Sequence, residues 1–236
     1  MLAPDLPLFA VADGMGGHKA GRYASNYAVE AVHEYVRQEW MAGIPLDETV
    51  LRCAVDTANH LVFADAEQDR AKRGMGTTLT ALMLVEDEFL ICHVGDSKAL
   101  RCRNGQCEQL TEDHSIIAER LRQGILSPEQ AASHPQRSVL SRSLGTRREL
   151  EVDILRVPVV PGDVFVLASD GLFSGVDGET IAAVITEAIS AQDACDELVT
   201  RACKADDSDN VTVLIVACRT ITPADRKATN ICQEDA

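Results

Sequence analysis

Four aspartates stand at the ends of apolar segments, where a rigid sheet can present charged side chains to a shared cleft. Asp13 and Asp170 each follow an apolar run and precede a glycine, Asp96 follows an apolar run and a glycine, and Asp209 comes just before the last apolar run. Carboxylates gathered in one place repel each other unless a cation lies between them. Because no histidine or cysteine cluster accompanies them, the pattern favours a site for Mg²⁺ or Mn²⁺.

The chemistry that such a site supports is phosphate ester hydrolysis. Two divalent ions side by side can hold and deprotonate a water molecule and neutralise a phosphoryl group. Each aspartate also has a structural interpretation, because Asp-Gly is a common turn. The spacing of the four residues favours the metal site and by itself leaves both interpretations open.

The elements that must position these aspartates are helices and apolar strands. We expect strands over residues 8–12, 77–85, 89–94, 99–103, 152–157, 164–168 and 211–218, and helices over 20–41, 47–66, 115–123, 127–132, 178–189 and 193–203. Asn104-Gly105 predicts a hairpin turn. The strands are apolar throughout, which predicts burial on both faces, and the order of elements predicts an α+β fold with helices covering sheets. With no linker or repeat, we expect one domain over residues 1–220 and a polar tail over 221–236.

Composition narrows the class of protein. The 22 Lys and Arg against 37 Asp and Glu give a net charge of −15, which disfavours nucleic acid as a partner. No apolar run is long enough to span a membrane, and the first residues do not resemble a signal peptide. The eight cysteines contain no Cys-x-x-Cys pair and several lie in apolar runs, so we expect reduced cysteines in a cytoplasmic protein.

Six short motifs resemble, in order, those of the metal-dependent type 2C protein serine/threonine phosphatases of the bacterial branch. They are Asp13-Gly14-Met15-Gly16-Gly17-His18, Gly74-Met75-Gly76-Thr77-Thr78, Val94-Gly95-Asp96-Ser97, Leu110-Thr111-Glu112-Asp113-His114-Ser115, Ser169-Asp170-Gly171-Leu172 and Asp209-Asn210-Val211-Thr212. The resemblance covers residues 8–218. It implies an α-β-β-α sandwich of two central, mostly antiparallel sheets flanked by helices, and a metal-dependent hydrolysis of phosphoserine and phosphothreonine on proteins that reverses Ser/Thr kinase signalling.

The resemblance also assigns the metal ligands. Asp13 would bridge two ions, Mn²⁺ or Mg²⁺, and the carbonyl of Gly14 would bind the second. Asp170 and Asp209 would hold the first ion. Asp96, with Asp170, would hold a weaker third ion.

Two further residues receive roles from the motifs. His18, in the Gly-rich turn, is a candidate general acid, with a local structural role as the alternative. The segment 113–144 resembles the flap that helps to choose substrates, and its Arg142 is a candidate for substrate binding. The implied partners are phosphorylated proteins and a cognate Ser/Thr kinase, and we expect a monomer.

Residues that the family carries ahead of the Asp-Gly motif are not found before Asp13. These are an arginine that would clamp the substrate phosphate and an acidic pair that would help to hold the second metal. We therefore expect the chain as written to bind substrate weakly, and a version extended upstream to melt higher and turn over faster. The alternative is a pseudophosphatase that binds phosphorylated partners without hydrolysing them.

Two other enzyme classes fit less well. In a nucleotide-binding Gly-rich turn the third glycine position would be Lys19, and the chain has no Gly-Lys-Ser or Gly-Lys-Thr. A metal-dependent nuclease would also use carboxylates, but the charge of −15 disfavours it.

Overall fold

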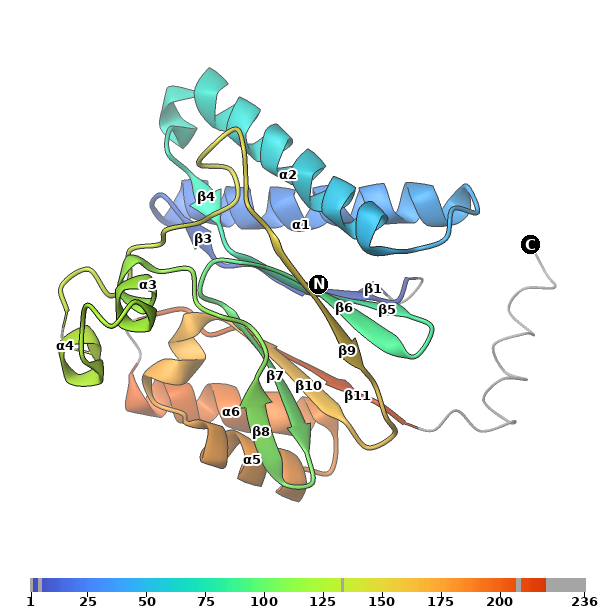
Figure 1. Ribbon diagram of the computed structural model, residues 1–236, viewed down its shortest axis with the longest axis vertical. Helices are drawn as coiled ribbons and strands as arrows, with labels where there is room; N and C mark the ends of the chain where they lie inside the picture. The colour runs from blue at the N-terminus through green and yellow to red at the C-terminus, as the bar shows by residue number, and fades with distance from the viewer. Residues whose placement is uncertain (1, 4–5, 133, 207–208, 220–236) are drawn as a thin grey trace.

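Two antiparallel sheets lie face to face between two pairs of helices in the computed structural model, which describes residues 2–3, 6–132, 134–206 and 209–219 (Figure 1). The first sheet has the order β1 (Leu2–Ala3), β2 (Leu8–Val11), β5 (Leu79–Val85), β6 (Glu88–Val94), β9 (Asp153–Pro158). The second has the order β11 (Val213–Ala217), β10 (Val164–Ala168), β7 (Lys98–Arg103), β8 (Gln106–Gln109). A two-stranded pair, β3 (Gly14–Met15) and β4 (Gly76–Thr77), adjoins them. The expected α-β-β-α sandwich is confirmed.

Helices cover the outer face of each sheet. The long helices α1 (His18–Met41) and α2 (Glu48–Gln68) pack on the first sheet, and α5 (Gly178–Glu187) and α6 (Ala191–Ala205) pack on the second (Figure 1). The short helices α3 (Ile116–Arg122) and α4 (Pro128–Ala132) lie in the excursion between β8 and β9. None of the helices in the described ranges combines the length and the apolar character needed to cross a membrane.

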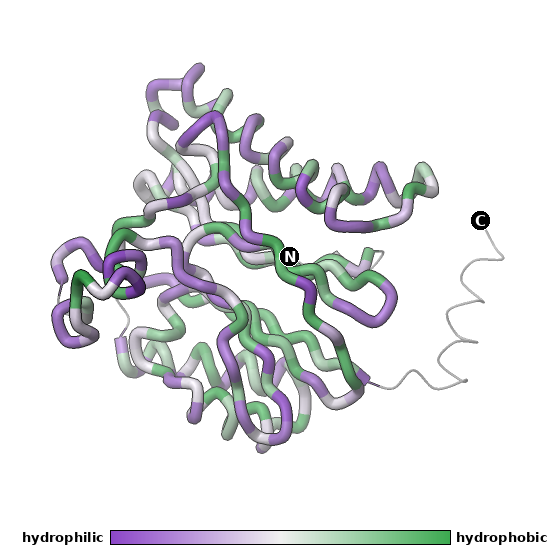
Figure 2. The backbone as a smooth tube through the Cα atoms, viewed as in Figure 1, coloured by the Kyte–Doolittle hydropathy of each residue, from purple (hydrophilic) through white to green (hydrophobic). Residues whose placement is uncertain are grey.

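Strand β6 shows why the apolar runs have no polar face. Its alternate residues point to opposite sides of the sheet. Leu90 and Cys92 belong to the core under α1 and α2, whereas Phe89 and Ile91 belong to the core between the two sheets. There Phe89 packs edge-on against Phe165 of β10, with ring centroids 4.8 Å apart. The hydropathy of the backbone follows the same layers, with apolar segments along the strands and polar ones on the outer turns (Figure 2).

The observed elements differ from the expected ones in two places that matter for the site. The strand expected over 77–85 is divided at Thr78, where the backbone and side chain turn to bond with Asp13. The last strand begins at Val213, because Thr212 is already engaged in hydrogen bonds with Ser169. The tail expected over 221–236 lies outside the described residues.

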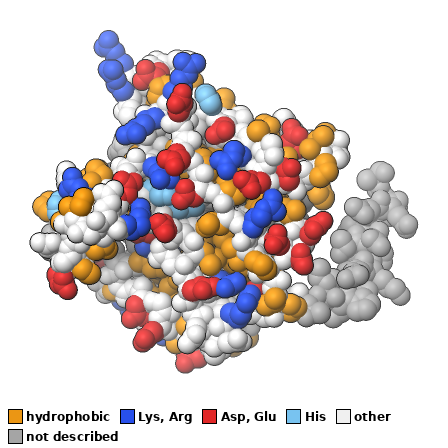
Figure 3. All heavy atoms as spheres, viewed as in Figure 1, with side chains coloured by type: hydrophobic (Ala, Val, Ile, Leu, Met, Phe, Trp, Pro, Cys, Tyr) orange, Lys and Arg blue, Asp and Glu red, His pale blue; other side chains and the backbone are white. Residues whose placement is uncertain are grey.

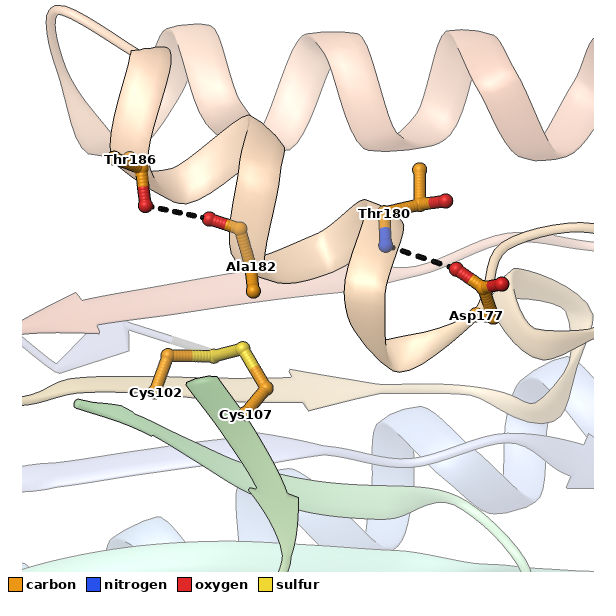
Figure 4. Close-up of a disulfide and its surroundings, with 6 residues drawn as sticks. All are labelled: Cys102, Cys107, Asp177, Thr180, Ala182 and Thr186. Carbon is orange, nitrogen blue, oxygen red and sulfur yellow. Dashed lines mark hydrogen bonds between the residues drawn. A yellow bond between two sulfur atoms is a disulfide. The ribbon is translucent and has the colours of Figure 1, made fainter. Parts of the chain in front are cut away.

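The expectation that all cysteines are reduced is wrong for one pair. Cys102 of β7 and Cys107 of β8 form a disulfide across the hairpin, next to α5 (Figure 4). The Asn104-Gly105 turn, predicted correctly, sets a register in which these two residues face each other directly. Sequence spacing alone did not reveal the pair, because the hairpin register decides which residues meet. Among the other described cysteines, those at positions 53, 92, 195, 203 and 218 are free.

Candidate metal centre

The ends of the two sheets bring the four predicted aspartates to one place. Asp96, Asp170 and Asp209 line a hollow of about 370 Å³. Asp13 is close enough to Asp170 and Asp209 for their charges to act on it. The structure therefore unites residues from four separate segments of the chain, as the sequence predicts.

Asp13 is held at the end of β2 by two threonines. Its N–H donates to Thr78 Oγ1 at 2.8 Å, and its carbonyl accepts from Thr78 N–H at 2.8 Å and from Thr77 Oγ1 at 2.9 Å. With the backbone bonded on both sides, the carboxylate is directed by a rigid turn. The motif Gly74-Met75-Gly76-Thr77-Thr78 is thus the clamp on Asp13, a role that the sequence does not disclose.

The residue after Asp13 packs directly on helix α1. A Cβ on Gly14 would lie 1.9 Å from the carbonyl oxygen of Gly21, and a Cβ on Gly21 would lie 2.5 Å from the carbonyl oxygen of Gly14. Both glycines are required by this close approach of two backbones. The contact fixes the position of the Gly14 carbonyl, which is the predicted ligand of the second ion.

Asp170 and Asp209 meet because β10 and β11 are paired. Beyond the paired strands, Ser169 Oγ accepts from Thr212 N–H at 3.0 Å and donates to the Asn210 carbonyl at 3.2 Å. A Cβ on Gly171 would lie 2.5 Å from the Asn210 carbonyl oxygen. The Asp170-Gly171 step is therefore needed for the close approach of these two segments.

Asp96 lies in the tight turn between β6 and β7. Gly95 has φ of +108°, and a Cβ there would lie 2.6 Å from the side chain of Thr78. Ser97 Oγ is 2.8 Å from Thr78 Oγ1. The turn that carries Asp96 is thus joined to the same threonine that holds Asp13.

The electrostatics of the cluster show how costly its negative charge is. Burial, followed by the charges of Asp170 and Asp209, raises the pKa of Asp13 to about 6. Burial, followed by the charges of Asp170 and Asp113, raises the pKa of Asp96 to about 7. The pKa of Asp170 is also raised, first by burial and then by Asp209. A cation placed among these groups would reverse the shifts.

An orphaned oxygen tests whether the cluster suits a metal. Oδ1 of Asp170 is buried and has no hydrogen-bond partner in the described part of the chain. A buried carboxylate oxygen without a donor is unfavourable unless a cation satisfies it. The donor set, four carboxylates and a backbone carbonyl, is the oxygen set that hard divalent cations prefer. Across the described residues no three acidic, His or Cys side chains converge closely enough to enclose an ion in this arrangement.

Basic and polar groups complete the wall of the hollow. Lys98 Nζ lies 2.8 and 2.7 Å from the two carboxylate oxygens of Asp113, and Arg137 and Ser138 line the same hollow from the flap. Arg137 is exposed and forms no ion pair within the described ranges. The sequence did not single out these residues as functional, although Asp113 belongs to the motif Leu110-Thr111-Glu112-Asp113-His114-Ser115.

The two remaining candidate site residues are Arg142 and His18. Arg142 donates to Asp153 Oδ1 at 2.9 Å and lies 3.6 Å from Glu151, and it lines a separate hollow of about 500 Å³. Its guanidinium is engaged by these carboxylates, and it is not among the residues that line the carboxylate hollow, so its contact with substrate stays a prediction. His18 begins α1, and its side chain lies outside what the structure describes.

Acidic and basic side chains alternate over the face seen in Figure 3.

Comparison with known proteins agrees with this geometry. The profile of the protein phosphatase 2C family matches residues 2–207. The chain is 37% identical over 212 residues to "Serine/threonine phosphatase stp" of Listeria welshimeri, covering 89% of this chain and 84% of that protein.

Two solved structures extend the agreement to the fold. The Mycobacterium tuberculosis serine/threonine phosphatase PstP/Ppp superposes with a TM-score of 0.81 at 33% identity, over 91% of this chain and 89% of that one. The catalytic domain of the phosphatase PstP in complex with two manganese ions gives a TM-score of 0.77 at 32% identity, over 89% and 86% of the chains. Motifs, fold and carboxylate cluster agree with one another: this chain belongs to the protein phosphatase 2C family.

Proposed function

We propose that the protein hydrolyses phosphoserine and phosphothreonine on other proteins with the help of two Mn²⁺ or Mg²⁺ ions. The observation that carries the proposal is the cluster of four aspartates, three of them partly buried with raised pKa values, together with the orphaned oxygen of Asp170. Its relatives include proteins named serine/threonine phosphatases, and one similar structure contains two manganese ions.

The predicted ligands fit this role in their positions. The charges of both Asp170 and Asp209 act on Asp13, which supports its role as a shared ligand, and Gly14 follows it on a backbone packed against Gly21. Asp96, near Asp170, suits a third and weaker ion. When bound, the ions would supply a water molecule of lowered pKa and neutralise charge on the phosphoryl group.

The chain's own residues would then orient the substrate. Arg137 and Lys98 bring positive charge to the wall of the carboxylate hollow. We propose that Arg137, which forms no ion pair in the described part of the chain, attracts the phosphate, and Arg142 stays a second candidate for substrate binding. A planar guanidinium suits a phosphate through paired hydrogen bonds. His18 stays a candidate general acid. If it has that role, replacing it should reduce turnover most for substrates whose leaving group has a high pKa.

The proposal also covers the domain organisation, the partner kinase and the compartment of the enzyme. We propose a single phosphatase domain over residues 1–220, which the family match over 2–207 supports. The phosphorylated substrates would be produced by a cognate Ser/Thr kinase. We also propose that the protein is a monomer and that it works in the cytoplasm. The five free cysteines among the described residues suit a reducing compartment, where the Cys102–Cys107 pair would depend on the redox state.

A phosphothreonine peptide tests the proposal. We expect turnover with Mn²⁺ or Mg²⁺, none in excess EDTA, and none in Asp170→Asn even with Mn²⁺. Asp87→Asn is the matched control, since Asp87 lies exposed in the turn between β5 and β6 and should leave turnover unchanged. Hydrolysis that persists in chelator would refute the metal assignment. Peptide binding without turnover, under the same conditions, would favour the pseudophosphatase.

A further inference from the structure

A buried histidine holds the turn that carries Asp96. His114, 1% exposed, follows β8 at the entrance to the flap. Its N–H donates to the Gly95 carbonyl at 2.7 Å, and its Nδ1 accepts from the Gly95 N–H at 3.2 Å. Both backbone groups of Gly95, directly before Asp96, are therefore bonded by one residue.

These bonds determine the tautomer of His114. Because Nδ1 accepts a hydrogen bond, the ring proton must be on Nε2. From Nε2 it donates to Asp153 Oδ2 at 3.0 Å, and Asp153 Oδ1 accepts from Arg142 at 2.9 Å. The other tautomer would direct two N–H groups at each other between Gly95 and the ring. Asp153 thus selects the form of the histidine that can hold Gly95.

The base of the flap ends on the same residue. Ser141 N–H donates to the His114 carbonyl at 2.9 Å, and Ser115 and Leu140 form an antiparallel bridge. Residues 116–139, which include Arg137 at the carboxylate hollow, are closed into a loop at this point. His114 is therefore bonded to the Asp96 turn, to Asp153 of β9 and to Ser141, where the flap returns beside its first residues.

From this arrangement we propose that His114 is a positioning residue that fixes Asp96 for metal binding, with Asp153 and Arg142 holding its ring in the required tautomer. This explains why Arg142 is engaged away from the carboxylate hollow: its part is to orient Asp153. The inference rests on the proposed function only in taking Asp96 as a metal ligand.

Two substitutions of His114 separate positioning from packing. Asparagine places an amide oxygen near the position of Nδ1, so His114→Asn can still accept from Gly95. Glutamine places its amide near Nε2, so His114→Gln can still donate to Asp153 but releases Gly95. Calorimetric titration with Mn²⁺ should show the weaker class of sites half-filled at about tenfold higher concentration in His114→Gln, the effect of one lost hydrogen bond to a buried group. His114→Asn should stay close to the wild type.

Asp163→Asn controls for general loss of stability. Asp163 is also fully buried, accepts from Arg103 and from the Val160 N–H, and lies at the opposite end of β10 from the metal centre. The Asp163→Asn substitution should lower Tm without changing the affinity for Mn²⁺. Equal loss of Mn²⁺ affinity in the Asn and Gln variants, or in Asp163→Asn, would overturn the proposal.

Two further measurements keep the test independent of folding and of catalysis. Should His114→Gln not fold, Asp153→Ala, at a partly exposed position, should weaken the same Mn²⁺ sites in the same direction. Nitrogen-15 NMR of the wild type should show His114 protonated on Nε2 and not on Nδ1, and the opposite tautomer would overturn the proposal. If the wild type bound no Mn²⁺ but His114 had the expected tautomer, the proposed metal function would be wrong. The hydrogen bonding of His114 to Gly95 would still be supported.

Discussion

At the scale of the residue, Asp13 shows how a functional site works against stability. Its carboxylate is held beside Asp170 and Asp209 by backbone hydrogen bonds from two threonines. Burial and the two neighbouring charges raise the pKa of Asp13, and a backbone hydrogen bond at Gly14 offsets only part of that rise. The fold therefore carries an electrostatic cost that a bound cation removes.

This cost predicts a pH-dependent effect of Asp13→Asn on the metal-free protein. The folded pKa of Asp13, about 6, lies above its ordinary value of 3.8, so the folded state retains a proton that the unfolded chain has released. Its contribution is fully present below the unfolded pKa of 3.8 and is lost as pH rises from there through about 6. The variant should melt like the wild type near pH 3.5 and a few degrees higher near pH 7.5.

The pH dependence of the wild type alone does not isolate Asp13, because buried histidines change the stability with pH in the opposite direction. Burial lowers the pKa of His93 to about 4, and it lowers the pKa of His114 too, so both favour the folded state more as pH rises. Asp13→Asn retains both histidines. Calorimetric scans at the two pH values measure the difference, and a variant less stable than the wild type at the higher pH would contradict the prediction. Mn²⁺ should raise Tm in the wild type and not in the variant.

At the scale of the element, helix α1 is positioned by a glycine where alanine would form a better helix. Gly21 costs the helix about 1 kcal/mol relative to alanine, yet its missing Cβ admits the Gly14 carbonyl. The packing of α1 on β3 therefore requires glycine at position 21, although alanine has the higher helix propensity.

We expect Gly21→Ala to destabilise the protein and to weaken Mn²⁺ binding, because the turn after Asp13 must move away from α1. Gly178→Ala is the matched control: Gly178 is the first residue of α5, and no atom lies within 4 Å of the position of its Cβ. That change should leave stability equal or slightly higher. Thermal melts and Mn²⁺ titrations of the two variants measure the difference, and equal behaviour would show that the Gly14–Gly21 contact is dispensable.

The hairpin β7–β8 gives a second prediction at this scale. The disulfide closes a short loop, for which chain entropy gives about 2 kcal/mol of stabilisation. Cys102→Ser with Cys107→Ser should therefore lower Tm. Turnover should be unchanged at temperatures where the variant is folded, because the pair lies at the end of β7 away from Asp96, roughly 20 Å along the strand. Reduction of the wild type by dithiothreitol should reproduce the shift in Tm. A loss of Mn²⁺-dependent turnover in the folded variant would instead show that the hairpin communicates with the metal centre.

At the scale of the whole molecule, the layer between the sheets joins the two halves of the metal centre. Asp13 extends from the first sheet, and Asp170 from the second, so their separation depends on how the sheets pack. Phe165 of the second sheet and Phe89 of the first are at the centre of this layer. The distance between the carboxylates is thus a property of the core.

Phe165→Ala should cost about 3–5 kcal/mol of unfolding free energy, since the ring is fully buried. Denaturant melts followed by circular dichroism should show one transition for both sheets. Trp40→Ala is the control: this ring is 51% exposed at the end of α1, and its loss should change stability by less than about 1 kcal/mol. Two separate transitions in the Phe165 variant would show that the halves of the sandwich fold independently.

The sequence by itself determined the composition of the site and the succession of elements. The apolar runs predicted buried strands with carboxylates at their ends, so Asp13, Asp96, Asp170 and Asp209 could be named as candidate ligands from the sequence, and the motifs favoured the metal site over simple turns. The hairpin turn at Asn104-Gly105 was equally local, because two adjacent residues specify it.

Only the tertiary structure decided which distant groups meet. The bonds from Thr78 to Asp13 and from His114 to Gly95 join segments far apart in the chain. The ion pair of Arg142 with Asp153 depends on the path of the flap, and the Cys102–Cys107 disulfide depends on hairpin register. Local propensity and periodicity act over a few residues, whereas these contacts arise from the packing of two sheets and a loop in three dimensions.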